Sequence, residues 1–172
     1  MAEEIINRVA NSSLINLDLE EMYPEGERVL YDLKDNLWQG LALKEKDFRA
    51  FIKEHDWSEY KGKNVAIYCS VDAIIPSWAY LLLSTAINPY ANFVTQGNLE
   101  TLEVALWENE IAKIDPKDYE DAKLVIKGCS DKEVPASAYL ALGRKLQPVV
   151  KTMMFGEACS TVPLYKKPRN SA

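Results

Sequence analysis

The chain has 172 residues, of which 48% are hydrophobic and 27% are charged, and its formal net charge is −6. This length and composition fit one soluble globular domain with a sizeable core. The acidic balance argues against a nucleic-acid partner, because binding the phosphate backbone needs a basic face.

The opening third of the chain predicts an antiparallel meander followed by a helix. Hydrophobic and polar residues alternate over residues 14–19 and 29–33, as in half-buried strands, and residues 37–44 predict a third strand. Asp47 is expected to cap a helix that runs to His55. The apolar stripe of this helix includes His55, which is the only histidine in the chain.

The centre of the sequence repeats itself after 59 positions. Residues 64–97 and 123–156 align without gaps, and each copy predicts a strand, a polar loop, a helix that opens with proline, and a second strand. Nine positions of the first copy are identical in the second: Ile67, Asp72, Pro76, Ala79, Tyr80, Leu81, Leu83, Pro89 and Gly97.

Strand–helix–strand units of this length normally form parallel crossovers within one sheet. Residues 64–69 and 123–128 are nearly continuous apolar runs, as in buried parallel strands. We therefore expect a single α/β domain over residues 1–167, with both copies of the repeat in one sheet and the meander capping or extending it. The helix over residues 98–112 has an acidic outer face, and residues 168–172 are expected to be disordered.

Three cysteines follow predicted strands. Cys69, Cys129 and Cys159 each come directly after a strand or within a few residues of its end. Parallel pairing would bring these ends to one edge of the sheet, where α/β proteins bind ligands. Three thiols suit zinc or iron, and a carboxylate such as Asp72 would complete the metal site. No Cys-x-x-Cys motif supports this site, and free cysteine often acts as a small buried hydrophobic residue.

The same residues allow other interpretations. Asp72 and Asp131 share one position of the repeat, shortly before a helix, where aspartate commonly caps the first turn. Cys69 could instead be a catalytic thiol with His55 as its base. A third hypothesis is a non-catalytic module that binds a protein through the acidic helix, and a homo-oligomer also stays open. The familiar enzyme motifs are missing, so catalytic residues are unknown and no cofactor-binding motif is identified.

The compartment is predicted from the N-terminus and the cysteines. Residues 1–8 include acidic residues where a signal peptide has basic ones. No apolar run in the sequence approaches the roughly 18 residues of a membrane-spanning helix. Three dispersed cysteines do not form a secreted disulfide pattern. The sequence therefore predicts a cytoplasmic protein with reduced thiols and no membrane partner.

Several short stretches together resemble a known family. They include Glu54-His55-Asp56-Trp57, Cys69-Ser70-x-Asp72-Ala73, Ile126-Lys127-Gly128-Cys129 and Glu157-x-Cys159-Ser160-Thr161. With these, essentially the whole chain resembles domain-of-unknown-function family 2480, found mainly in Bacteroidetes. The family has no established activity. The resemblance implies an accessory role in metal or sulfur handling for iron–sulfur assembly, and it implies no catalytic residues.

Overall fold

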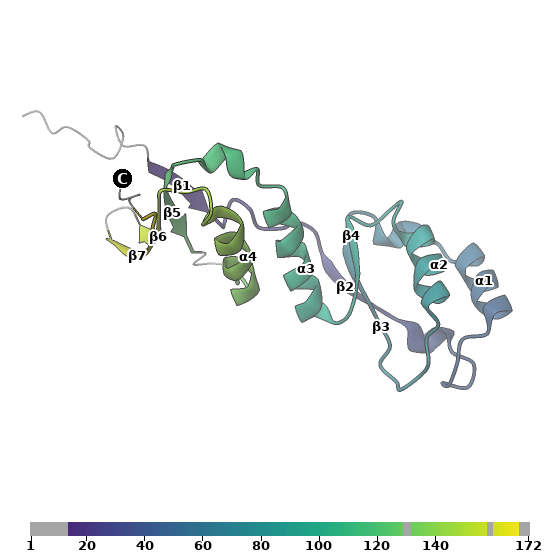
Figure 1. The fold of residues 1–172 in the computed structure, drawn as a ribbon. Coiled ribbons are helices and arrows are strands. Elements are labelled where there is room, and N and C mark those ends of the chain that lie inside the picture. Colours follow the sequence, from purple (N-terminus) through teal and green to yellow (C-terminus); the bar gives the residue numbers. More distant parts are fainter. Residues whose placement is uncertain (1–13, 129–131, 158–159, 169–172) are drawn as a thin grey trace, which may run out of the picture. The chain divides into compact units, whose positions relative to one another are not determined.

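The computed structural model describes residues 14–128, 132–157 and 160–168, and the chain divides into two compact units (Figure 1). The continuous unit spans residues 25–106. The discontinuous unit combines the residues up to 24 with those from 107 onward. The division falls within helix α3 (Leu99–Ala112), and each unit has its own sheet. Among the described helices, none is long and apolar enough to cross a membrane.

The continuous unit contains a three-stranded parallel sheet in the order β2-β3-β4. Its strands are β2 (Arg28–Asp32), β3 (Asn64–Tyr68) and β4 (Phe93–Gln96). The first four residues of the central strand β3 are all buried. A strand of this kind is hydrophobic throughout because side chains are covered on both faces of the sheet.

Helices α1 (Glu45–Glu54) and α2 (Ser77–Ile87) pack on one face of this sheet. On the opposite face, Ala66 packs against Leu102 and Leu106 from the first part of α3. The larger cluster, on the face of α1 and α2, joins both helices to the strands: Tyr31, Leu33, Phe48, Trp57, Val65, Ile67, Ala79, Leu83 and Ile87. Successive side chains of β3 point to opposite faces of the sheet, so its residues pack against helices on both faces.

The discontinuous unit has a four-stranded sheet in the order β1-β5-β6-β7. Strands β1 (Leu14–Asp18), β5 (Lys123–Lys127) and β6 (Thr152–Glu157) are parallel, and β7 (Ser160–Lys166) is antiparallel to β6. Helix α4 (Ala136–Leu146) connects β5 to β6.

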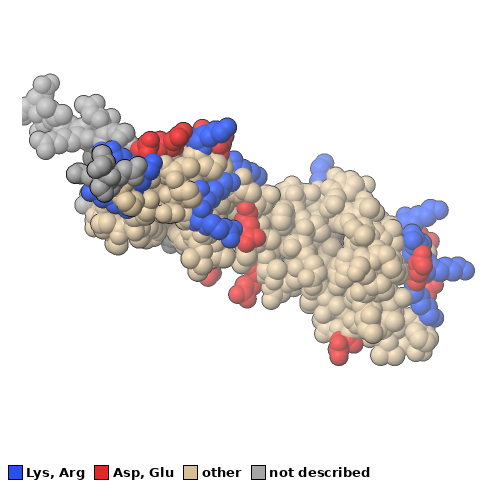
Figure 2. All heavy atoms as spheres, viewed as in Figure 1, with Lys and Arg blue, Asp and Glu red and all other residues tan. Residues whose placement is uncertain are grey.

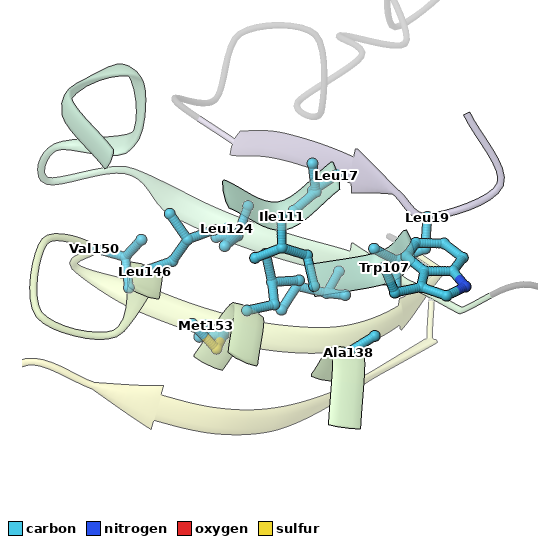
Figure 3. Packing of buried hydrophobic residues seen from close by; sticks show 11 residues of the cluster. Leu17, Leu19, Trp107, Ile111, Leu124, Ala138, Leu146, Val150 and Met153 are labelled. Atoms are coloured by element: carbon cyan, nitrogen blue, oxygen red, sulfur yellow. The ribbon is translucent and has the colours of Figure 1, made fainter. Parts of the chain in front are cut away.

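The core of the discontinuous unit lies between its sheet and two helices. Trp107 and Ile111 come from the second part of α3, and Leu142 and Leu146 come from α4. They pack against Leu124 and other sheet residues. Figure 3 shows the labelled side chains of this cluster gathered between the helices and the strands.

The two units repeat one arrangement of strands, helices and turns, as the sequence predicts. Asn64 pairs with Phe93, and Lys123 pairs with Thr152, so both registers follow the 59-position repeat. A 3-10 helix precedes the first strand of each copy, at Trp57–Tyr60 and at Pro116–Tyr119. The internal repeat of a strand, a helix and a second strand is therefore confirmed and begins before residue 64.

Strands β1 and β2 extend the repeat to a part of the chain where the sequence does not show it. Leu14 pairs with Lys123 as Arg28 pairs with Asn64, so the two strands occupy equivalent places in their sheets. Asp18 ends β1 as Asp32 ends β2. The continuous unit is thus inserted into the discontinuous unit after its first strand.

Two sequence predictions about pairing are corrected. β3 and β5 lie in different sheets, so the prediction of one sheet for both copies of the repeat is wrong. β1 and β2 pair in parallel with β5 and β3, and they do not form the expected meander. A strand's alternating pattern shows which face is buried, and it carries no information about which distant strand lies beside it.

Two local predictions also change. Residues 37–44 form a turn with isolated bridges at Trp38 and Ala42 in place of the expected third strand. Helix α1 begins at Glu45 after Lys44, so Asp47 lies in its first turn and does not cap it.

Candidate binding surface

Asp32 organises the carboxyl end of the parallel sheet in the continuous unit. Its Oδ1 accepts hydrogen bonds of 3.0 Å from the backbone N–H groups of Lys34 and Ser70. Burial alone would raise the pKa of Asp32, but hydrogen bonds from Ser70 and Lys34, with the nearby Lys34 ammonium, lower it to about 2. The charged carboxylate therefore ties the loop after β3 to the end of β2.

Cys69 and Asp72 lie in the loop that Asp32 holds. Cys69 follows β3 directly. It is half-buried, and its thiol is not in a disulfide. Asp72 is exposed, and α2 begins after Pro76 without a side-chain cap. The capping interpretation of Asp72 is therefore wrong, and its counterpart Asp131 lies outside the described residues.

The metal site with Cys69, Cys129, Cys159 and Asp72 stays a prediction. Cys129 and Cys159 lie outside the described residues, so their positions do not test it. Over the ranges 14–128, 132–157 and 160–168, no group of three His, Cys, Asp or Glu side chains is arranged to hold a metal ion. The premise of a shared sheet edge is lost, because Cys69 follows β3 whereas Cys129 follows β5 of the other sheet.

His55 occupies an aromatic environment at the end of α1. Its ring stacks on Phe51 with 5.0 Å between centroids and meets Trp57 edge-on at 4.4 Å. Its Nε2 lies 2.7 Å from a carboxylate oxygen of Glu59. Among the described residues, His55 makes no hydrogen bond or ion pair with Cys69. The ring contacts of His55 favour a packing role for the histidine, and within the described ranges it does not act as a hydrogen-bonded base for the Cys69 thiol.

The surface of the continuous unit is unusually poor in charge around α2. Residues 73–99 contain no Asp, Glu, Lys, Arg or His. Within this run Ile74 is 84% exposed and Leu81 on α2 is 69% exposed. Figure 2 shows the region over α2 without charged side chains, which gather instead toward α1. Water thus meets large apolar side chains on a stretch of 27 residues that carries no charge.

A short hairpin adds apolar side chains beside Ile74. Trp38 N–H donates to the Ala42 carbonyl at 2.8 Å, and Ala42 forms a parallel bridge with Ile74. Gln39 and Gly40 both have positive φ, as a tight two-residue turn requires. Exposed Trp38 and Leu41 flank this turn. We call Trp38, Leu41, Val71 and Ile74, all exposed large hydrophobic residues, the loop-end surface.

The comparisons with known proteins place the chain in a family and go no further. A family model described as "Protein of unknown function (DUF2480)" matches residues 3–167. The chain belongs to the DUF2480 family. No curated protein and no solved structure matches it.

Sequence reasoning missed the loop-end surface for two reasons. The lack of charge over residues 73–99 is visible in the sequence, but charge-poor runs are also typical of buried strands and helices. The hairpin depends on a positive φ at Gln39, a residue type that gives no signal for this conformation. Three-dimensional contacts were needed to bring Trp38 and Leu41 beside Ile74 in the DUF2480 fold.

Proposed function

We propose that this protein is a non-catalytic module that binds another protein through the loop-end surface and the uncharged outer side of α2. The observation that carries the proposal is the high exposure of Ile74 and Leu81 within a stretch that has no charge. Exposed apolar patches mark interaction sites, and the centres of protein interfaces are depleted of charge and rich in aromatic residues. Trp38 supplies such an aromatic anchor.

The loop-end surface is held in place before any partner arrives. The hairpin is closed by backbone hydrogen bonds at Trp38 and Leu41, and Lys44 Nζ lies 3.9 Å from the centre of the Trp38 ring. Asp32 holds the neighbouring loop through the Ser70 N–H. A preorganised surface loses less conformational entropy on binding, so more of its contact energy becomes affinity.

A protein partner fits this surface better than a lipid bilayer. Helices that lie on membranes carry Lys and Arg along their polar side, whereas α2 has no charged residue. The formal net charge of −6 also opposes approach to an anionic leaflet. The partner complementary to the outer side of α2 is a protein face that is itself apolar and poor in charge, because a charge opposite α2 would lose its hydration without a counter-ion on this helix.

The test is site-specific photo-crosslinking in cells that express the full chain. A photoreactive phenylalanine derivative at Ile74 or Leu81 should form a discrete crosslinked product, identified by mass spectrometry. The same derivative at Lys53, an exposed position on α1, is the matched control. Substituting Trp38→Glu should abolish the product formed from Leu81 while leaving the fold intact by circular dichroism. Equal crosslinking from Lys53, or sedimentation of the purified protein with neutral vesicles, would contradict the proposal.

A metal- or sulfur-handling role is a second proposal, favoured by the free thiol of Cys69 at a strand end beside the loop-end surface. It needs Cys129 and Cys159 as further ligands for zinc or iron, with Asp72 assisting. Metal should then protect all three thiols of the folded chain from alkylation. Equal labelling with and without zinc or ferrous iron would leave Cys69 as a packing residue.

A further inference from the structure

Gly143 lies where a glycine is unfavourable. It is inside α4, where glycine lowers helix stability relative to alanine, and it does not have a positive φ. A Cβ built on Gly143 would meet no atom within 4 Å. The equivalent residue of the continuous unit is Ser84, whose hydroxyl donates to the Leu81 carbonyl. Neither the backbone conformation nor the packing of the described residues around Gly143 requires a glycine, and the open space beside it leaves room for close approach by another molecule.

Gly143 opens onto an apolar groove of about 420 Å³. The groove lies beside α4 and over β5, β6 and β7, and six residues line it: Ile126, Tyr139, Gly143, Met153, Phe155 and Leu164. Strand β7 extends the sheet, but it remains poorly covered, because Val162 and Leu164 are exposed large hydrophobic residues. The groove is thus a strip of core surface that the described part of the unit leaves open.

A projecting leucine stands next to this groove. Leu140 precedes Gly143 by three residues, so the two are neighbours on the surface of α4. Its side chain is 76% exposed, which makes it one of the most exposed large hydrophobic residues of the described chain. The surface around Leu140 and Gly143 therefore presents both an exposed apolar side chain and an apolar groove.

We propose that this face of the discontinuous unit is the interface of a symmetric homodimer, in which Leu140 of each copy enters the groove beside Gly143 of the other. A two-fold interface uses the same patch on both subunits, so the patch must be complementary to itself. Leu140 and the groove at Gly143 meet that requirement side by side. The glycine then permits close approach at the contact, at the expense of helix stability in the free chain.

The arrangement of β7 favours contact through the face of the sheet. An exposed edge strand can pair with its counterpart in a second copy through backbone hydrogen bonds. Pro163, in the middle of β7, lacks the N–H group that such pairing uses and is typical of edges protected against it. The apolar face carrying Leu164 is therefore the part of β7 available to a second copy. This interface is separate from the loop-end surface and the outer side of α2, which belong to the continuous unit.

The experiment is sedimentation equilibrium of the full chain over a series of protein concentrations. Wild-type protein should approach twice the 19.5 kDa mass of one chain at micromolar concentration. Leu140→Glu would place a charge in the partner's apolar groove, and Gly143→Phe would fill the groove. Each should raise the dimer dissociation constant at least about tenfold. Leu81→Glu is the matched control, because Leu81 occupies the equivalent exposed position on α2.

The outcomes separate this proposal from its alternatives. A wild-type monomer at every concentration, as expected if a small apolar ligand or another protein fills the groove, overturns it. Equal weakening by Leu81→Glu and Leu140→Glu also overturns it. If circular dichroism shows that Leu140→Glu disturbs the fold, Gly143→Phe decides the question alone. Leu81→Glu should lose the proposed protein partner and keep the dimer, so the two proposals fail independently.

Discussion

Replacing Asp32 by asparagine should destabilise the protein in a pH-dependent way. Asparagine keeps an oxygen that can accept from the Ser70 and Lys34 N–H groups, but it removes the negative charge. The carboxyl has a pKa of about 2 in the folded chain against an ordinary value of 3.8. At roughly 1.36 kcal/mol for each pH unit, that difference corresponds to about 2 kcal/mol.

The expected loss is smaller, because Asp32 lies close to the surface. Its side chain is 13% exposed, and solvent screens its interaction with the Lys34 ammonium. We expect Asp32→Asn to lower the free energy of unfolding by about 1–2 kcal/mol at pH 7. The folded pKa lies below the unfolded one. The stabilisation is therefore fully present above about pH 4 and disappears as the pH falls through about 2.

Urea unfolding followed by tryptophan fluorescence at several pH values between 7 and 2 measures this difference. The curves for wild type and Asp32→Asn should converge on the acid side. Asp72→Asn is the control, because Asp72 is exposed and accepts no hydrogen bond among the described residues. A difference that stays constant from pH 7 to pH 2 would refute the assignment of the charge. An equal loss for Asp72→Asn would restore the capping role that the structure removes.

Two further substitutions test the turns that support the three-stranded sheet, and a third serves as a control. Asn64→Ala should cost about 1–3 kcal/mol in urea unfolding, because the 1% exposed side chain donates to the Glu25 carbonyl at 2.7 Å. Lys123→Ala, at the equivalent but exposed position, should change stability by less than about 0.5 kcal/mol. Gly97→Ala should lower the melting temperature, with a cost of about 1–3 kcal/mol. Its φ is 137°, and a Cβ would sit 2.7 Å from Thr101. An unchanged melting temperature would show that the turn relaxes freely.

The repeat and its helices could be predicted because buried hydrophobic residues recur at a regular spacing in the sequence. Ala79 and Leu83 of α2, and Ala138 and Leu142 of α4, are identical between copies and buried in both. Strand partners could not be predicted in the same way. Leu17 alternates with polar neighbours whether its strand lies beside the next strand in sequence or beside β5, more than a hundred residues away. The sequence therefore predicted the elements of the repeat, and it failed on the strand over residues 37–44 and on the division into two sheets.

The candidate surfaces were hidden for a related reason. Ile74 and Leu81 are apolar residues in an apolar run, and only their exposure distinguishes them from core residues. Asp32 was overlooked because its partner Ser70 lies 38 positions away. The cysteines attracted attention by their chemistry, yet only Cys69 lies among the described residues. Chemical type is visible in a sequence, whereas exposure and distant contacts are properties of the fold.

Helices α2 and α4 differ in the charge on their outer sides. The two helices occupy equivalent places and bury equivalent residues. Helix α4 nevertheless carries Arg144 and Lys145 where α2 has Thr85 and Ala86. Lys145 even stabilises its unit, since its Nζ donates to the Ile111 and Ala112 carbonyls at the end of α3. This arrangement of strands and helices thus tolerates charge on the outer side of the helix. Folding therefore does not require the lack of charge on α2, which supports the proposed binding of an apolar partner there.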